Sequence, residues 1–419
     1  MSDSKRTLMS DSKRTLMVVS GGVEALPGIE RAHQLGLHVV VSDGAPDAPG
    51  FGIADDHLVA STYDVDATVA AAVDFSSNVR PIDGVICVAS DVPVTVAAVA
   101  AELNLVGVPL ESAMIVADKV AMKERFADAA IPIPWFAELE STEDLATAID
   151  EKGFPLVVKP VDSRGARGVL LLKDSSVDPA WAFKKAQSES PSARVMVEQF
   201  LDGPQVSTES LVIDGETHTI GLADRNYEYL DRFAPYIIEN GGQLPTSRTG
   251  AECVSIRSLI QRTAESLSVR DGVIKGDVVI HSGEAKVIEV ALRLSGGYLC
   301  SHEIPLSTGV DFLGAAIRIA LGESPTSSEL LPTSNRGVAQ RWLFPEPGLV
   351  RQVTGADEVR ARPEVDMCEI RVLAGDVVTP AESHPARAGV VIATGGTRDE
   401  AVASAARAVD AIKIETTSS

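Results

Sequence analysis

The sequence predicts a multidomain protein in which an α/β part is followed by α+β parts. As far as about residue 113, short apolar runs alternate with helical stretches, which is typical of a parallel sheet with crossover helices. Beyond that point, pairs of β-rich runs flank Gly-containing turns, which favours antiparallel hairpins mixed with helices. The chain of 419 residues is long enough for roughly two to four domains.

The N-terminal part has four expected strands, at residues 16–19, 38–42, 84–88 and 105–108. Helical patterns lie between or after them, at residues 29–35, 65–73 and 93–103. Ser20-Gly21-Gly22 follows the first strand, but it lacks the G-x-G-x-x-G spacing of a dinucleotide-binding loop. We interpret it as a tight strand-to-helix turn. Asp43 ends the second strand and leaves nucleotide binding open as the alternative.

The first sixteen residues are set apart from this pattern. The polar octapeptide at residues 1–8 recurs at residues 9–16, and each copy begins with Met. We exclude residues 1–16, with the exception of Leu16, from the fold and expect this segment to be disordered.

Composition excludes several classes of function. The formal net charge of -22 is unsuited to phosphate backbones, so we expect no nucleic-acid partner. No apolar run approaches the roughly 20 residues that span a bilayer, so we expect no membrane partner. The four cysteines are scattered, without metal-finger spacing. We expect a cytoplasmic protein with reduced thiols.

The middle of the chain contains a lysine in an unusual setting. Lys159 lies within the apolar strand at residues 155–160, directly before a loop of small residues and arginines at 162–168. A buried lysine needs an anionic partner, and the backbone N–H groups of such a loop can approach phosphate oxygens. Together these features indicate phosphate binding. The alternative is an outward-facing lysine on an edge strand, followed by an ordinary hairpin.

Two acidic residues occupy the two strands of another expected hairpin. Asp277 and Glu289 each lie within an apolar run, and Arg293 follows four residues after Glu289. Buried carboxylates need a partner, and Mg²⁺ takes carboxylate together with phosphate oxygens. The arrangement indicates a metal site with a neighbouring cation. A structural Arg–Glu pair is the alternative.

The tail shows no motif with a chemical role. Short strands are expected at residues 339–344, 369–372 and 389–394, and a helix at 398–412. Thr397 and Glu400 form a capping box at the start of this helix. We expect the tail to be a small structural domain.

The order of these residues resembles the ATP-grasp superfamily. The pattern runs from Lys119 and Lys159 through Glu198-Gln199-Phe200-Leu201 to the hairpin with its arginine. In layout it is similar to biotin carboxylase and to the bacilysin-type L-amino-acid ligases. The resemblance implies a Rossmann-like domain at 17–113 and an ATP-grasp domain at 114–330 with a mobile lid at about 153–197. It also implies a small C-terminal α+β domain at 335–415.

The resemblance also implies roles for individual residues. It assigns ATP binding to Lys119, Lys159, Ser163, Gly165, Arg167, Gly168, Glu198, Gln199, Phe200, Leu201 and Gln205. Glu198 would meet the adenine, and Gln205 stands where the family has a ribose-binding Glu. Asp277 and Glu289 would hold Mg²⁺, with Mn²⁺ as the alternative ion. Ala291 replaces an Asn of the family, which puts a second metal in question.

Arg293 is the implied catalytic residue, which stabilises an acyl phosphate. Glu239, in a long polar and aromatic loop, resembles the amino-acid-ligase branch and would face a substrate's amino group; Ser295, Gly296 and Gly297 would complete the substrate site. The implied activity joins a small carboxylate, as of an amino acid, to an amine with release of ADP and phosphate. A homodimer is compatible with the resemblance.

Two other functions stay open at this point. One is a bicarbonate-activating carboxylase of the biotin carboxylase or purine-pathway type, against which the segment around Glu239 argues. The other is a non-catalytic ATP-binding protein, which would not need Asp277, Glu289 and Arg293 together.

Overall fold

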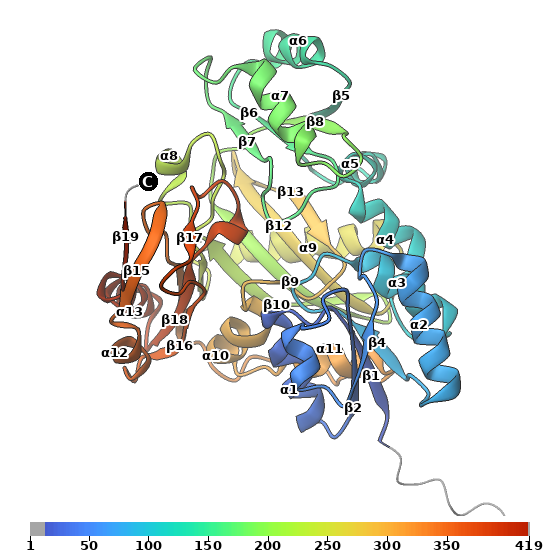
Figure 1. Ribbon diagram of the computed structural model, residues 1–419. Coiled ribbons are helices and arrows are strands. Elements are labelled where there is room, and N and C mark those ends of the chain that lie inside the picture. The colour runs from blue at the N-terminus through green and yellow to red at the C-terminus, as the bar shows by residue number, and fades with distance from the viewer. Residues whose placement is uncertain (1–12, 418–419) are drawn as a thin grey trace, which may run out of the picture.

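The computed structural model of the protein describes residues 13–417 and has three parts (Figure 1). A parallel sheet forms the N-terminal part, drawn in blue. A small subdomain stands at the top of the view, and a large antiparallel sheet runs through the centre into the C-terminal part at the left. The predicted α/β and α+β fold class is confirmed by these elements and by the solved structures described below.

The N-terminal sheet has four parallel strands in the order β3-β2-β1-β4. They are β1 (Thr15–Val19), β2 (His38–Asp43), β3 (Asp56–Val59) and β4 (Gly84–Ile86). Helices α1 (Leu26–Gln34), α2 (Val65–Asn78) and α3 (Pro93–Glu102) accompany them, with short 3-10 turns at Val23–Ala25 and Pro49–Gly52. The strand predicted at residues 105–108 is wrong, because the structure has no strand there.

Alternation along β1 explains why the sheet is covered on both faces. Leu16 and Val18 pack with α1 and α11 (Phe312–Ala320), whereas Met17 and Val19 pack with α2 and α3. Successive side chains of a strand point to opposite faces, so both sets are buried. The expected disorder of residues 1–16 is therefore wrong for Thr15, which belongs to β1 together with Leu16. Residues 1–12 lie outside the described residues.

The top subdomain is an antiparallel sheet in the order β5-β8-β6-β7, here named the β5–β8 subdomain (residues 136–199). Its strands are β5 (Phe136–Leu139), β6 (Leu156–Pro160), β7 (Leu170–Leu172) and β8 (Val195–Gln199). Helices α6 (Thr142–Lys152) and α7 (Pro179–Ser188) share its apolar core. The subdomain begins before the lid start predicted at 153, because β5 and α6 pack into the same core.

The large sheet has eight antiparallel strands in the order β13-β12-β9-β10-β11-β14-β18-β16. The first five are β9 (Gln205–Ile213), β10 (Glu216–Arg225), β11 (Gly242–Leu244), β12 (Gly272–His281) and β13 (Glu284–Ala291). The last three come from the tail: β14 (Gly337–Trp342), β16 (Val365–Ile370) and β18 (Gly389–Gly395). The tail therefore extends the central sheet and has no separate main sheet of its own.

Helices complete the central and C-terminal parts. They are α4 (Leu110–Ala117), α5 (Lys119–Asp128), α8 (Leu230–Phe233), α9 (Gly250–Ser266), α10 (Ile304–Thr308), α12 (Ala356–Arg360) and α13 (Arg398–Ala411). A π-helical turn spans Leu299–Glu303, and a 3-10 turn spans His384–Ala386. A small sheet in the order β17-β15-β19 joins β15 (Gly348–Thr354), β17 (Val377–Val378) and β19 (Lys413–Thr417). The predicted capping box of Thr397 and Glu400 opens α13.

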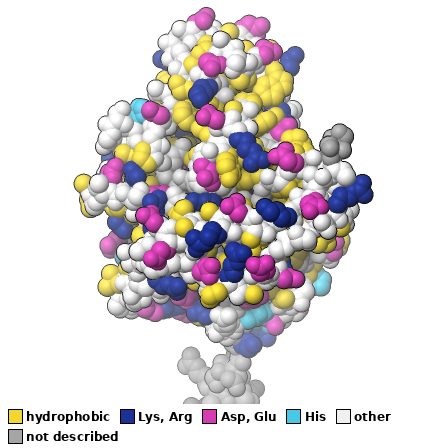
Figure 2. Space-filling view, turned by 90° about the vertical axis from the view of Figure 1, so that its left-hand side faces the viewer, with side chains coloured by type: hydrophobic (Ala, Val, Ile, Leu, Met, Phe, Trp, Pro, Cys, Tyr) yellow, Lys and Arg dark blue, Asp and Glu magenta, His cyan; other side chains and the backbone are white. Residues whose placement is uncertain are grey.

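Charged side chains of both signs intermingle on the face shown in Figure 2, and no single basic patch gathers there. This distribution agrees with the net charge of -22. Within residues 13–417, no helix has both the length and the apolar character of a bilayer span.

Candidate active site

A cavity of about 670 Å³ opens where the three parts of the molecule meet. It gathers every predicted site residue except Gly168: Lys119, Lys159, Ser163, Gly165, Arg167, Glu198, Gln199, Phe200, Leu201, Gln205, Glu239, Asp277, Glu289, Arg293, Ser295, Gly296 and Gly297. Gly168 lines a smaller neighbouring hollow instead. Residues from distant parts of the chain thus share one wall.

A cluster of three buried charges lies beneath one end of the cavity. Glu198, on β8, has its two carboxylate oxygens 2.7 Å from Lys123 Nζ and 2.6 Å from Lys159 Nζ. Burial opposes ionisation of Glu198, but the two ammonium groups outweigh it and hold the pKa of Glu198 below its usual value. Lys159, which was expected to need an anionic partner, therefore has one within the protein. The contact between Glu198 and an adenine stays a prediction. In such a contact, the adenine would share the Glu198 carboxylate with the two lysines that already bind it.

The two expected metal ligands face each other across the β12–β13 hairpin. Asp277 pairs in register with Glu289, and both line the cavity. Asp277 already has partners: its oxygens lie 2.5 Å from Lys275 Nζ and 2.7 Å from Arg225 Nη1. Burial opposes ionisation of Asp277, but these cations outweigh it and keep its pKa far below the usual range. Glu289 Oε1 lies 3.4 Å from Lys119 Nζ.

The donor set is compatible with Mg²⁺, which commonly takes one or two carboxylates and completes its shell with phosphate oxygens and water. In residues 13–417, no group of three or more His, Cys, Asp or Glu side chains forms a protein-only cage. A metal ion here would therefore depend on the nucleotide for much of its shell. It would also have to displace a cation from Asp277.

Arg293 follows β13 and is held by the N-terminal part. Its Nε lies 3.3 Å from Asp91 Oδ1, in the loop after β4. Close by, Ser295 N donates to Glu209 Oε1 at 2.9 Å. Burial raises the pKa of Glu209 to about 7. An arginine fixed in this way is preorganised for an anion in the cavity.

The turn Ser295-Gly296-Gly297 is held by Glu24, from the 3-10 turn after β1. Gly297 N donates to Glu24 Oε2 at 2.8 Å, and an added Cβ at Gly296 would meet the same oxygen at 3.0 Å. Arg371 Nη2 binds the other Glu24 oxygen at 2.8 Å. N-terminal and C-terminal segments therefore meet at this turn.

The loop at residues 162–168 touches all three parts of the molecule. Lys119 Nζ donates to the Ser163 carbonyl at 3.0 Å. The Arg164 guanidinium lies 4.3 Å from the ring centroid of Tyr63, and the Gly165 carbonyl accepts from His384 N at 3.0 Å. The loop thus covers the cavity in this structure, and its mobility stays a prediction.

Glu239 lines the cavity but is already paired. Its Oε2 lies 2.7 Å from Arg225 Nη2, and the same guanidinium reaches Asp277. Arg225 therefore connects the expected substrate acid with the expected metal ligand. The proposed contact with a substrate ammonium would share Glu239 with this arginine.

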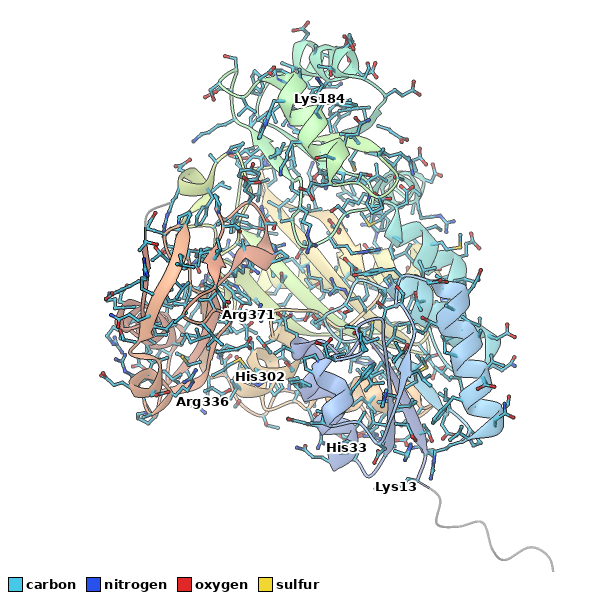
Figure 3. All side chains as sticks on the ribbon, in the orientation of Figure 1. Lys13, His33, Lys184, His302, Arg336 and Arg371 are labelled. Atoms are coloured by element: carbon cyan, nitrogen blue, oxygen red, sulfur yellow. The ribbon has the colours of Figure 1, made fainter. Side chains whose placement is uncertain are left out.

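Sequence reasoning missed several cavity residues. They are Glu24, Glu303, Trp342, Arg371, His384 and Arg387. Four of them come from the tail, which was expected to be a small structural domain, so residues of this domain also line the cavity. Figure 3 places Arg371 on the side of the C-terminal part that faces the centre of the molecule. The available signal was an arginine within the strand expected at 369–372 and another two residues before the strand expected at 389–394, but it does not reveal which sheet the strands join.

Comparisons with known proteins agree with this arrangement. The family model for the ATP-binding domain of the carbamoyl-phosphate synthase L chain matches residues 118–327, which is half of the chain, and the model for L-amino acid ligase C-terminal domain 2 matches residues 341–417. An uncharacterized protein of Sinorhizobium fredii is 25% identical over 92% of this chain and 79% of its own length. Biotin carboxylase of Pseudomonas aeruginosa is 25% identical over 74% of this chain and 70% of its own length.

Among solved structures, the L-amino acid ligase from Bacillus licheniformis superimposes with a TM-score of 0.82 at 22% identity, covering 98% of this chain and all of that one. The expected resemblance, the fold class and the ligase assignment are thereby confirmed. The lysines and hairpin carboxylates that line one cavity, together with the matching family models, lead to one conclusion: the chain belongs to the ATP-grasp superfamily of carboxylate–amine ligases.

Proposed function

We propose that the protein uses ATP and Mg²⁺ to join the carboxylate of an amino acid, or of a similar small acid, to an amine. One observation carries the proposal: a single cavity is lined by Lys119, Lys159, the facing acids Asp277 and Glu289, and the buried Arg293. Cations for a triphosphate, ligands for a metal and a cation for an acyl phosphate are the groups that such a reaction requires.

The triphosphate would lie between the loop at 162–168 and the β12–β13 hairpin. Lys119 contacts both the loop and Glu289 in this structure, so it lies between the expected phosphate and metal positions. Asp277 and Glu289 would hold Mg²⁺, which supplies charge neutralisation on the phosphates when bound. The loop would exclude water that otherwise hydrolyses the intermediate.

The reaction would proceed in two balanced steps. A carboxylate oxygen of the acid attacks the γ-phosphorus, and the bond to the leaving ADP oxygen breaks. The amine nitrogen then attacks the acyl carbon, the bond to phosphate breaks, and the nitrogen loses a proton. Arg293 would stabilise the acyl phosphate and then the tetrahedral oxyanion.

Three features support an amino acid as the acid. Glu239 supplies a carboxylate for an ammonium group on the cavity wall. The family model over residues 341–417 is that of an L-amino acid ligase domain, and the Bacillus licheniformis enzyme of that name shares the fold. Because free amino acids and ATP occur together in the cytoplasm, the proposal includes that location. Homodimer formation stays a prediction.

The test is a pooled-substrate reaction followed by mass spectrometry. The protein is incubated with ATP, MgCl₂ and L-amino acids, with and without bicarbonate. We expect condensation products whose masses equal two reactants minus water, together with ADP. AMP in place of ADP would reject an acyl phosphate, and bicarbonate-dependent ADP release without an amide would indicate a carboxylase instead.

The metal ligand has a matched control on the same hairpin. We expect Glu289→Gln to lower kcat/KM by about a hundredfold or more, because the amide is a much weaker Mg²⁺ ligand. Glu284, at the exposed start of β13, serves as the control, and Glu284→Gln should leave kcat/KM unchanged. Equal effects of the two substitutions would contradict the metal assignment.

A further inference from the structure

Arg387 is a buried cation without a carboxylate partner. It is 9% exposed, and it takes part in no ion pair with any of residues 13–417, although it lines the cavity. Its Nη2 donates to the Glu239 carbonyl at 2.5 Å, while its Nε is buried without an acceptor. Burial lowers the pKa of Arg387 to about 10, a level at which the group still carries its charge at neutral pH.

A second unpaired donor belongs to the same wall. The Arg387 guanidinium lies 4.4 Å from the ring centroid of Trp342, and Trp342 is 2% exposed and also lines the cavity. Its indole Nε1 has no acceptor. A buried donor without an acceptor is unfavourable, and both of these donors belong to residues that line one cavity. A ligand that supplies acceptors on this wall would relieve that cost.

The arginines Arg225, Arg293 and Arg371 of the same cavity have carboxylate partners, although Arg225 Nε also lacks an acceptor. Arg225 contacts Glu239 and Asp277, Arg293 contacts Asp91, and Arg371 contacts Glu24 and Glu369. Their charges are compensated within the protein. The charge of Arg387 has no carboxylate partner within residues 13–417, and its guanidinium, which lies over the Trp342 ring, is a group that can bind a carboxylate with two hydrogen bonds.

Arg387 and Arg293 lie next to strands that are far apart in the order of the large sheet. Arg293 follows β13 at one edge of the large sheet, whereas Arg387 directly precedes β18, and five strands lie between β13 and β18 in the sheet order. Two separate cations that line one cavity suit two carboxylates. The carboxylate beside Arg293 would become the acyl phosphate, whereas the carboxylate beside Arg387 would be bound without reacting.

We propose that Arg387 and the Trp342 indole N–H form the subsite for a carboxylate of the amine substrate. This inference rests on the proposed ligase function and makes it more specific: the acceptor is an amino acid with a free carboxylate, and the product is a dipeptide or a dipeptide-like acid. The planar guanidinium and the indole N–H donate to the carboxylate, which takes no part in bond formation.

The test compares acceptor amino acids with their C-terminal amides. Wild-type protein should use the acid at least about tenfold better than the amide, because the amide leaves the buried cation unpaired. Arg387→Met should lower kcat/KM for the acid by about a hundredfold and for the amide by less than about threefold. The KM for ATP should stay within about twofold, because the triphosphate site is untouched.

Controls separate a binding role from a folding defect. Arg407→Met replaces an exposed arginine on α13 and should change neither acceptor. Thermal unfolding and MgADP binding are measured for each variant. If Arg387→Met does not fold, Arg387→Lys keeps the charge but loses the fork and the stack, and it should lose the acid selectively as well.

Two results would overturn the subsite and differ in what else they reject. Equal losses for acid and amide acceptors, or no loss at all, would remove Arg387 from the acceptor site while leaving the ligase function intact. If the wild-type protein formed no amide with any acceptor, the proposed function would fail and the subsite with it.

Discussion

Buried charges line the cavity, and nearly every one lies beside an opposite charge. Glu198 shows why this matters, because its carboxylate is the shared partner of Lys123 and Lys159. Removing one member of a buried ion cluster leaves uncompensated charge, which is far more costly than losing an exposed pair.

Glu198→Ala should therefore destabilise the protein strongly. We expect the free energy of unfolding to fall by about 3–5 kcal/mol, measured by urea denaturation at neutral pH. Glu140→Ala, at an exposed position near β5, should change it by less than about 0.5 kcal/mol. A small effect of Glu198→Ala would mean that the lysines lose their protons and do not need the carboxylate.

Glu303 predicts a pH dependence of stability. Burial, together with the nearby charge of Glu239, raises its pKa to about 8 from the ordinary 4.5. The folded state then binds more protons than the unfolded state between these values, so stability falls as pH rises through this window. The slope approaches about 1.4 kcal/mol lost per pH unit.

Glu303→Gln should remove this loss. The free energies of unfolding of wild type and variant are compared by urea titration at several pH values between about 5 and 8.5. The variant should gain stability relative to wild type as pH rises, and the difference should level off above pH 8. A constant difference across the range would show that Glu303 is ionised throughout.

At the scale of elements, the loop at 162–168 joins parts of the molecule that its own strands do not reach. Arg164 lies over Tyr63 of the N-terminal part, and the Gly165 carbonyl binds the His384 backbone of the tail. A loop held by both the N-terminal part and the tail would exclude water from an acyl phosphate.

Tyr63→Ala should loosen this cover. We expect more ADP to be released per amide formed, by about two- to fivefold, because a cation–π contact of about 1 kcal/mol is lost and water gains access. Coupled assays of ADP and product measure the ratio. Tyr63→Phe keeps the ring and should behave as wild type, whereas an unchanged ratio in Tyr63→Ala would remove the contact from the closing of the loop.

At the scale of the whole molecule, the eight-stranded sheet makes the tail part of the core. Strand β14 pairs with β11 and β18, and an apolar cluster joins Trp342 and Val390 of the tail to Tyr298. The wall of the cavity therefore depends on residues of the tail.

A chain ending at residue 334 should not fold as a stable unit. Its β11 edge and the surface around Tyr298 would be exposed. We expect low solubility, strong binding of a hydrophobic dye and loss of MgADP binding. A cooperatively unfolding fragment with intact MgADP binding would restore the idea of a separate C-terminal domain.

Many features of this protein are determined by short stretches of its sequence. The alternation of strands and helices, the expected hairpins, the capping box at Thr397 and the spacing from Asp277 to Glu289 depend on neighbours within about twenty residues. Their periodicities follow from backbone geometry alone. For that reason the fold class was predictable, whereas most of the cavity residues were predicted from the resemblance to the ATP-grasp superfamily.

Only the tertiary structure decided which charges neutralise one another and how the tail is used. Glu24 and Arg371 meet although 347 residues separate them, and Arg387 reaches the cavity because β18 joins the central sheet. A local sequence pattern does not predict such long-range contacts, because they depend on which faces of the packed helices and strands lie against each other. The pairing of Glu198 with two lysines, and the absence of an acidic partner for Arg387 within residues 13–417, follow from that packing.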